Sequence, residues 1–277
     1  MKVFLRFALF TAFIFCWNHV SAQAPIADFT ATPLTGCAPL VVNFTSTSTG
    51  NPTSYQWNLG NGVNTVQQNP STAYTLPGTY TVTLTVSNAN GTNTKTVTNY
   101  ITVIPNPAIS ITAVDSADCP PFNVQFNNLT NLNAPGPGTF SWSFGDGNVS
   151  SMQNPTNVYY NPGFYNVTLV ATNSAGCAST LTLPSLINVY TPPVTNFTAT
   201  PTSYCGTPAP ITFNASTSGW GPITYNWDFG DGNMGVGASP THMYTNSGTY
   251  TVTLIATDVN GCKDTVVQPN YISIGSI

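Results

Sequence analysis

The stretch "WDFGDG" occupies residues 227–232, and it recurs as "WSFGDG" at 142–147 and as "WNLGNG" at 57–62. The tryptophan, an apolar residue and both glycines are present in all three copies, whereas the carboxylates are not. Asp228 is replaced by asparagine in one copy and by serine in the other, and Asp231 is replaced by asparagine in the first copy. The parts common to all copies are therefore an aromatic anchor and a glycine-rich turn.

This substitution pattern decides between a chemical site and a structural turn. A general acid–base pair needs ionisable groups, and a hard cation prefers several anionic oxygens. Asparagine and serine supply neither, but they share with aspartate a short side chain that accepts hydrogen bonds from nearby backbone N–H groups. We predict a turn next to a buried tryptophan, built from Trp57, Gly60, Gly62, Trp142, Gly145, Asp146, Gly147, Trp227, Gly230, Asp231 and Gly232.

The third copy alone leaves a calcium site open. Asp228, Asp231 and Asn233 cluster there, although their spacing is not that of an EF-hand loop. No other feature of the sequence predicts a cofactor, and calcium stays the one option.

The tryptophan spacing extends to the whole chain. Trp57, Trp142 and Trp227 lie 85 residues apart, and a tyrosine, a glycine and a leucine repeat at the same interval. Self-similarity at a fixed period indicates tandem structural units. We place the units at 23–105, 106–191 and 192–277, with proline-containing junctions between them, after a leader at 1–22.

Each unit has the pattern of an all-β domain. "TYTVTLTV" at 79–86 alternates apolar and threonine residues, and "YNVTLVA" and "YTVTLIA" repeat this pattern in the other units. Period-two alternation of β-branched residues is typical of a half-buried strand. Short strands between Gly, Pro and Asn turns predict a β-sandwich, so the chain should be three sandwiches in an extended array.

The leader has the features of a secretory signal peptide. Lys2 and Arg6 precede an apolar run at 7–17, and Val20-Ser21-Ala22 forms a small-residue cleavage site. The apolar run is shorter than the about 20 residues needed to cross a bilayer. We expect secretion or display at the cell surface, with cleavage after Ala22 and no membrane insertion.

Composition narrows the possible functions. Only 4% of residues are charged, the whole chain has four Lys and Arg residues, and two of these lie in the leader. Nucleic acids and anionic membranes are therefore not expected partners, because binding to them requires several basic groups. His242 is the only histidine outside the leader, and no catalytic motif is present. The sequence predicts a protein that is not an enzyme, and its low charge leaves self-association open.

The cysteines occupy two positions of the repeat. The early position holds Cys37, Cys119 and Cys205, and the later one holds Cys177 and Cys262, with Thr92 in the first unit. Pairing within units predicts disulfides Cys119–Cys177 and Cys205–Cys262, as an exported chain permits. Cys37 would then be unpaired, either as a thiol left over by drift or as a disulfide to another chain.

Taken together, these motifs resemble polycystic-kidney-disease (PKD) domains. The resemblance is carried by the Trp-x-Phe-Gly-Asp-Gly core, by "PGTYTVTLTVSN" at 77–88 with its counterparts, and by "NYITV" at 99–103. It implies an immunoglobulin-like sandwich and a non-catalytic extracellular role. Paired "GC" motifs, a "SAQA" cleavage site and the tandem copies also resemble surface proteins of bacteria that use type IX secretion.

Three functions follow as hypotheses. The first is a structural or adhesive surface protein whose semi-rigid modules contact extracellular proteins or other surfaces. The second is a carbohydrate- or matrix-binding accessory region of a larger exoenzyme, in which Trp220 of "SGWGPITY" stacks on a sugar ring; the alternative for Trp220 is that it covers the end of its own sandwich. The third is a subunit of a self-assembling filament or lattice.

Overall fold

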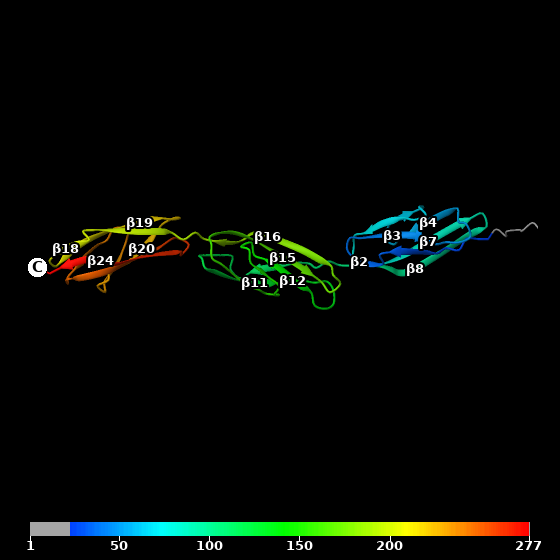
Figure 1. The fold of residues 1–277 in the computed structure, drawn as a ribbon. Coiled ribbons are helices and arrows are strands. Elements are labelled where there is room, and N and C mark those ends of the chain that lie inside the picture. Colours follow the sequence, from blue (N-terminus) through cyan, green and yellow to red (C-terminus); the bar gives the residue numbers. More distant parts are fainter. Residues whose placement is uncertain (1–22, 277) are drawn as a thin grey trace, which may run out of the picture. The chain divides into compact units, whose positions relative to one another are not determined.

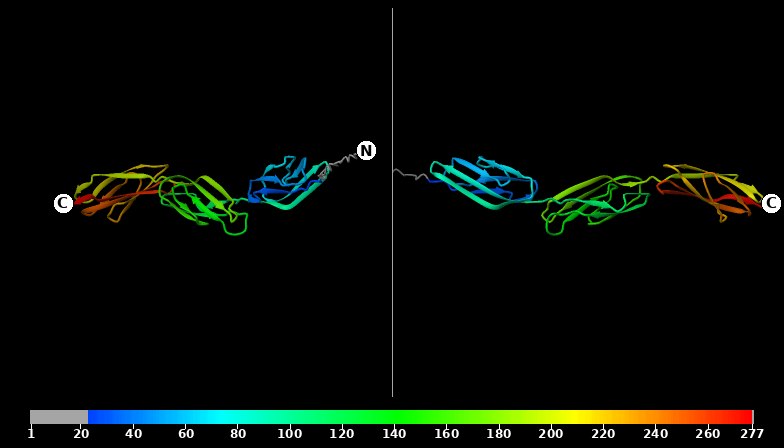
Figure 2. Two further views of the ribbon diagram at one scale, coloured as in Figure 1. Left: turned by 45° about the vertical axis from the view of Figure 1, so that its right-hand side comes forward. Right: turned by 180° about the vertical axis from the view of Figure 1, so that it is seen from behind.

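The computed structural model describes residues 23–276, which form three β-sandwich domains in chain order (Figures 1 and 2). The signal-peptide prediction for residues 1–22 lies outside this range. Each domain pairs a five-stranded sheet with a three-stranded sheet. The first domain, up to Pro105, forms one compact unit, and the other two, from Asn106 on, together form a second. Among the described residues, no helix is long and apolar enough to cross a membrane.

The first domain has sheet orders β1-β3-β6 and β2-β8-β7-β4-β5. Its strands are β1 (Phe29–Thr32), β2 (Thr35–Cys37), β3 (Leu40–Ser46), β4 (Ser54–Asn58), β5 (Asn64–Thr65), β6 (Ser71–Tyr74), β7 (Gly78–Asn88) and β8 (Gly91–Ile104). The alternation predicted for 79–86 is present in β7, where Val82, Leu84 and Val86 are fully buried.

The second and third domains repeat this topology strand for strand. The second has orders β14-β11-β9 and β10-β16-β15-β12-β13, and the third has β17-β19-β22 and β18-β24-β23-β20-β21. The second-domain strands are β9 (Ile111–Ala113), β10 (Ala117–Asp118), β11 (Phe122–Asn128), β12 (Thr139–Ser143), β13 (Val149–Ser150), β14 (Thr156–Tyr159), β15 (Gly163–Thr172) and β16 (Ala178–Val189). Those of the third are β17 (Val194–Thr200), β18 (Ser203–Cys205), β19 (Ala209–Ser218), β20 (Thr224–Asp228), β21 (Met234–Val236), β22 (Thr241–Tyr244), β23 (Gly248–Thr257) and β24 (Lys263–Gly275).

A short parallel strand lies at one edge of every five-stranded sheet. β2, β10 and β18 each pair in parallel with the last strand of their own domain, namely β8, β16 and β24. The pairing is with the final residues of that strand: Cys37 lies opposite Ile104, and Cys205 lies opposite Gly275. The early cysteine position of the repeat is thus held at the end of the sandwich where the last strand finishes.

The repeated tryptophan is the centre of each core. Trp57, Trp142 and Trp227 are at most 1% exposed. Each indole N–H donates a hydrogen bond of 2.9 Å to a backbone carbonyl ten residues later. A buried indole needs such an acceptor for its N–H, so the turn after the tryptophan has to fold back over it.

A tyrosine hydroxyl ties the second sheet to the same turn. Tyr74, Tyr159 and Tyr244 are fully buried and donate to the carbonyl oxygens of Leu59, Phe144 and Phe229. Burial raises the pKa of Tyr74 to about 12, and it raises the pKa of the other two further. The hydroxyls therefore remain protonated donors at neutral pH.

The first glycine of the hexapeptide is required by close packing. Gly145 has φ +84°, and a Cβ there would lie 2.6 Å from the carbonyl oxygen of Asn166. Gly60 and Gly230 repeat both the positive φ and the close approach to the neighbouring strand. Any side chain at this position would push β15, or its equivalent, away from the turn.

Candidate functional site

The hexapeptide forms a turn held by its own side chains. In the third domain, Asp228 Oδ1 accepts the N–H of Gly230 at 2.9 Å, and Asp231 Oδ1 accepts the N–H of Asn233 at 3.1 Å. The matching side chains of the other domains make equivalent bonds, namely Asn58, Asn61 and Asp146. An amide oxygen serves as well as a carboxylate here, which explains why the acids are interchangeable with asparagine.

A hydrogen-bonded cluster surrounds Asp231 on its other side. Its Oδ2 accepts from His242 Nε2 at 2.8 Å and from Asn233 Nδ2 at 3.1 Å, and the His242 ring stacks on Phe229 with centroids 4.2 Å apart. Both oxygens of Asp231 thus face N–H donors. Within residues 23–276, no group of three or more His, Cys, Asp or Glu side chains could hold a metal ion. Calcium at Asp228, Asp231 and Asn233, a set with only two such side chains, stays a prediction.

The Asp231 cluster predicts an acid-sensitive third domain. Burial raises the pKa of Asp231, but the hydrogen bonds from His242 and Asn233 outweigh it and bring the pKa below the ordinary value of 3.8. A lowered folded-state pKa stabilises the fold above the ordinary value, and this stability is lost as pH falls through the folded-state pKa. We expect the melting temperature of the third domain to fall as the pH is lowered below about 4. In Asp231→Asn, calorimetry should show a smaller drop in this window; an identical drop would exclude Asp231 as its source.

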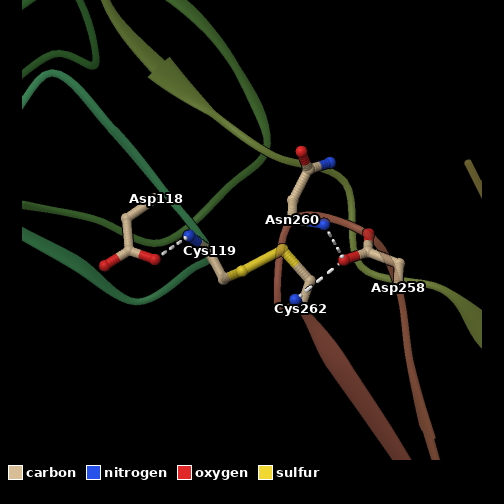
Figure 3. The surroundings of a disulfide bond; sticks show 5 residues. All are labelled: Asp118, Cys119, Asp258, Asn260 and Cys262. Carbon is tan, nitrogen blue, oxygen red and sulfur yellow. Dashed lines mark hydrogen bonds between the residues drawn. A yellow bond between two sulfur atoms is a disulfide. The ribbon is translucent and has the colours of Figure 1, made fainter. Parts of the chain in front are cut away.

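The cysteines lie at the ends of the sandwiches, and their pairing differs from the prediction. Cys119 of the second domain forms a disulfide with Cys262 of the third, with Cα atoms 5.4 Å apart (Figure 3). Cys205 is free and exposed. The predicted pairs Cys119–Cys177 and Cys205–Cys262 are therefore wrong. Cys37 and Cys177 are each disulfide-bonded, so the prediction of an unpaired Cys37 is wrong as well.

The length of the last strand explains why pairing within a domain fails. Cys119 follows β10, which pairs with the final residues of β16, whereas Cys177 directly precedes the first residue of that strand. β16 has 12 residues, which at about 3.3 Å each separate the two cysteines by roughly 40 Å. A disulfide requires Cα atoms within about 7 Å. The two repeat positions can meet only across a junction between domains.

The turn that presents Cys262 is built by Asp258. Its Oδ1 accepts the N–H groups of Asn260 and Cys262, both at 2.9 Å (Figure 3). Asn173 makes the same pair of bonds to Ala175 and Cys177 in the second domain. Cys262 is 1% exposed. The disulfide is thus anchored in a rigid turn on one side and at a sheet edge on the other.

Asp258 is also the weak point of this turn. Its Oδ2 is buried, and no donor among the described residues reaches it, whereas the amide of Asn173 donates to the Leu132 carbonyl at 3.3 Å. An unpaired buried polar atom costs about 1–3 kcal/mol. Asp258→Asn keeps the Oδ1 acceptor and replaces a buried carboxylate by a neutral amide, so it is expected to stabilise the third domain by about 1 kcal/mol in urea unfolding. The reverse change, Asn173→Asp, is the matched control and should destabilise the second domain; if both variants lose stability, the unpaired oxygen is not the cause.

Exposed aromatic side chains gather near the same junction. A pocket of about 340 Å³ is lined by Phe164, Asn188 and Tyr190 of the second domain and by Trp220 and Asn260 of the third. Trp220 is 80% exposed and Phe164 is 70% exposed. Trp220 therefore presents its ring to solvent and does not pack over its own sandwich. Aromatic rings and amide side chains that line one pocket can contact the apolar face and the hydroxyls of a sugar.

Sequence reasoning singled out Trp220 but missed its neighbours. Phe164 and Tyr190 come from the start of β15 and from the segment after β16, which are far apart in the chain. The sequence does contain one feature that points to this pocket. Phe164 stands where the other two domains have Thr79 and Thr249, so an aromatic replaces a polar residue on the outer face of a strand. Such a break in the repeat marks a surface specific to one domain.

The fold and the repeated turn define an all-β array of tandem immunoglobulin-like modules. The sequence profile of the PKD domain family matches residues 22–103, 105–186 and 190–274. The chain belongs to this family.

Known proteins resemble parts of the chain. A pre-pro-metalloprotease, PrtV, of Vibrio cholerae is 48% identical over 46 residues, which is 17% of this chain and 5% of the protease. The chain thus matches a small fraction of that relative's length. The PKD1 domain of Vibrio anguillarum Epp is 36% identical, covering 30% of this chain and 98% of that domain, with a TM-score of 0.26. The N-terminal eight Ig domains of Down Syndrome Cell Adhesion Molecule match 92% of this chain and 37% of that one, at 14% identity and a TM-score of 0.52.

Proposed function

We propose that this chain is a non-catalytic structural and adhesive protein, secreted or displayed at the cell surface, whose linked modules hold a cell to surrounding proteins or surfaces. The observation that supports this most strongly is the disulfide between consecutive domains. Such a bond suits a protein under tension, because it carries force across the junction without relying on the packing of either sandwich.

The chemistry of the same bond supports a location outside the cell. Structural disulfides persist in oxidising compartments and are rare in the cytosol. The leader at 1–22 supplies a route of export, and type IX secretion is one such route. The surface is also suited to this location, since threonine, serine and asparagine replace charged residues and make the fold insensitive to salt.

The adhesive role is tested with cells that make the protein. Attachment to hydrophilic glass under increasing flow is compared between wild-type cells, cells lacking the chain, and cells carrying Cys119→Ser/Cys262→Ser. We expect cells lacking the chain to detach at lower shear and the double variant to be intermediate. Antibody labelling of intact cells reports display. The proposal would be refuted if all three strains attached equally and the protein were found neither on the cell surface nor in the medium.

The aromatic pocket favours a second candidate, a carbohydrate-binding accessory function. The pocket combines the exposed rings of Trp220 and Phe164 with the amides of Asn188 and Asn260. A stretch of the pre-pro-metalloprotease PrtV is similar to 46 residues of this chain, which supports a role for such a sequence within a larger exoenzyme. Microcalorimetry with soluble polysaccharides should show binding that Trp220→Ala weakens at least about tenfold, since truncating an anchoring tryptophan of a binding site costs about 2 kcal/mol or more. Binding that is unchanged in Trp220→Ala removes this pocket from the candidates.

A further inference from the structure

Cys205 is the one free thiol among the described residues, and it lies at the end of the third domain. It is the last residue of β18, opposite Gly275 near the end of β24. The N–H of the next residue, Gly206, donates to the Gly275 carbonyl at 2.9 Å. The thiol is therefore held in place by the sheet edge and is accessible.

The same place in the second domain shows what such a cysteine does. Cys119 follows the parallel edge strand β10, where Asp118 lies opposite Val189 and its carbonyl accepts the N–H of Tyr190 at 2.9 Å. Cys119 and Cys205 therefore lie at the same kind of edge strand, in the same register and at the same end of their sandwiches. Cys119 is bonded to Cys262, which belongs to the following domain. This end of a domain is thus built to receive the turn cysteine of the next domain.

We propose that Cys205 is the attachment point for a further PKD-type domain, through a disulfide to the cysteine of its Asn/Asp-x-x-Gly-Cys turn. That turn is the one that presents Cys262, and Asn173-Ser174-Ala175-Gly176-Cys177 has the same pattern. The domain is either part of the same polypeptide or part of another one. This inference goes beyond the adhesive role and stands without it.

A second copy of this chain does not fit as the partner. The turn of its first domain carries Thr92, which is exposed, at the position of the buried Cys262. Its other two turn cysteines, Cys177 and Cys262, are already disulfide-bonded. The partner is therefore a PKD-type domain with a free turn cysteine of its own.

The bond forms by thiol–disulfide exchange. An exported thiol–disulfide oxidoreductase first holds the turn cysteine of the partner as a mixed disulfide. The Cys205 thiolate attacks the partner's sulfur, so that a new S–S bond forms and the mixed S–S bond breaks. The oxidoreductase cysteine leaves as a thiolate and takes up the proton that Cys205 released. Two cysteines are oxidised, and one disulfide of the oxidoreductase is reduced.

The first test maps Cys205 in the protein made by its own cells. Thiols are blocked with N-ethylmaleimide before lysis, the protein is digested without reduction, and linked peptides are sequenced by mass spectrometry. We expect Cys205 joined to a peptide containing Asn/Asp-x-x-Gly-Cys. Electrophoresis with reductant separates the two sources, since a partner on another polypeptide is released and one on the same polypeptide is not. Cys205 found blocked, bound to a small thiol, joined to a second Cys205 or joined to any other sequence overturns the proposal.

A designed variant tests the same surface in the purified chain. Thr92→Cys places a cysteine in the turn of the first domain, so that a second copy can act as the following domain. Its matched control is Thr94→Cys, also exposed and two residues further along β8. In a glutathione buffer we expect Thr92→Cys to form reducible oligomers at least about tenfold faster than Thr94→Cys, because only the turn meets the geometry of the bond. Cys205→Ser should abolish the oligomers. Equal rates for the two cysteine variants would overturn the proposal.

Discussion

Replacing Cys119 and Cys262 together with serine is expected to lower the free energy of unfolding of the second and third domains by about 4–5 kcal/mol, because the unfolded chain regains the freedom of a large loop. The bond closes a sequence separation of 143 residues. Urea unfolding at fixed pH, followed by tryptophan fluorescence without reductant, measures the change. Cys205→Ser is the control, since Cys205 is exposed and free, and it should leave stability unchanged.

The same bond predicts a mechanical result. In a chain pulled from its two ends, the disulfide prevents 143 residues from contributing their full length to the extension. At about 3.5 Å per residue, complete reduction should lengthen the fully stretched chain by at least roughly 500 Å. Single-molecule force spectroscopy with and without reductant measures this. If the oxidised and reduced chains stretch to the same length and Cys119→Ser/Cys262→Ser unfolds like wild type, the bond is absent from the protein in solution.

Trp142→Ala is expected to destabilise the second domain by about 3–5 kcal/mol, the range for removing a large aromatic from a core. Trp142 is 1% exposed, packs against Phe126 and Phe144, and donates its indole N–H to the Met152 carbonyl. The substitution removes the ring contacts and leaves a cavity between the two sheets. Urea unfolding of the whole chain should show an early transition that belongs to this domain.

Trp220→Ala is the matched control for this substitution. It removes the same side chain from a position that is 80% exposed, and such surface changes usually alter stability by no more than about 0.5 kcal/mol. A similar loss of stability in both tryptophan variants would show that the burial of Trp142 does not explain the effect of Trp142→Ala.

Local sequence predicted the fold because the repeat shows the same physical requirements three times. The alternation in 79–86 specifies a strand with one buried face, and β7 has that face in the core. The interchange of Asp228 with Asn58 specifies a turn that needs only a hydrogen-bond acceptor, and both side chains accept from the glycine two residues later. Backbone propensity and the burial pattern depend on a few neighbouring residues, so both can be recognised in a single amino-acid sequence.

The disulfide pairing depended on an interaction that local sequence does not contain. Equal spacing of the cysteines suggested a staple within each domain, but β10 pairs in parallel with the far end of β16 and separates Cys119 from Cys177. Two cysteines of one domain thus lie at opposite ends of its sandwich, and Cys119 is bonded to Cys262 of the next domain. Sequence determined the β-sandwich repeat, the buried tryptophan and the side-chain-capped turn. The tertiary structure alone decided which cysteines meet and that Trp220 faces solvent, because both depend on which strand ends lie together in space.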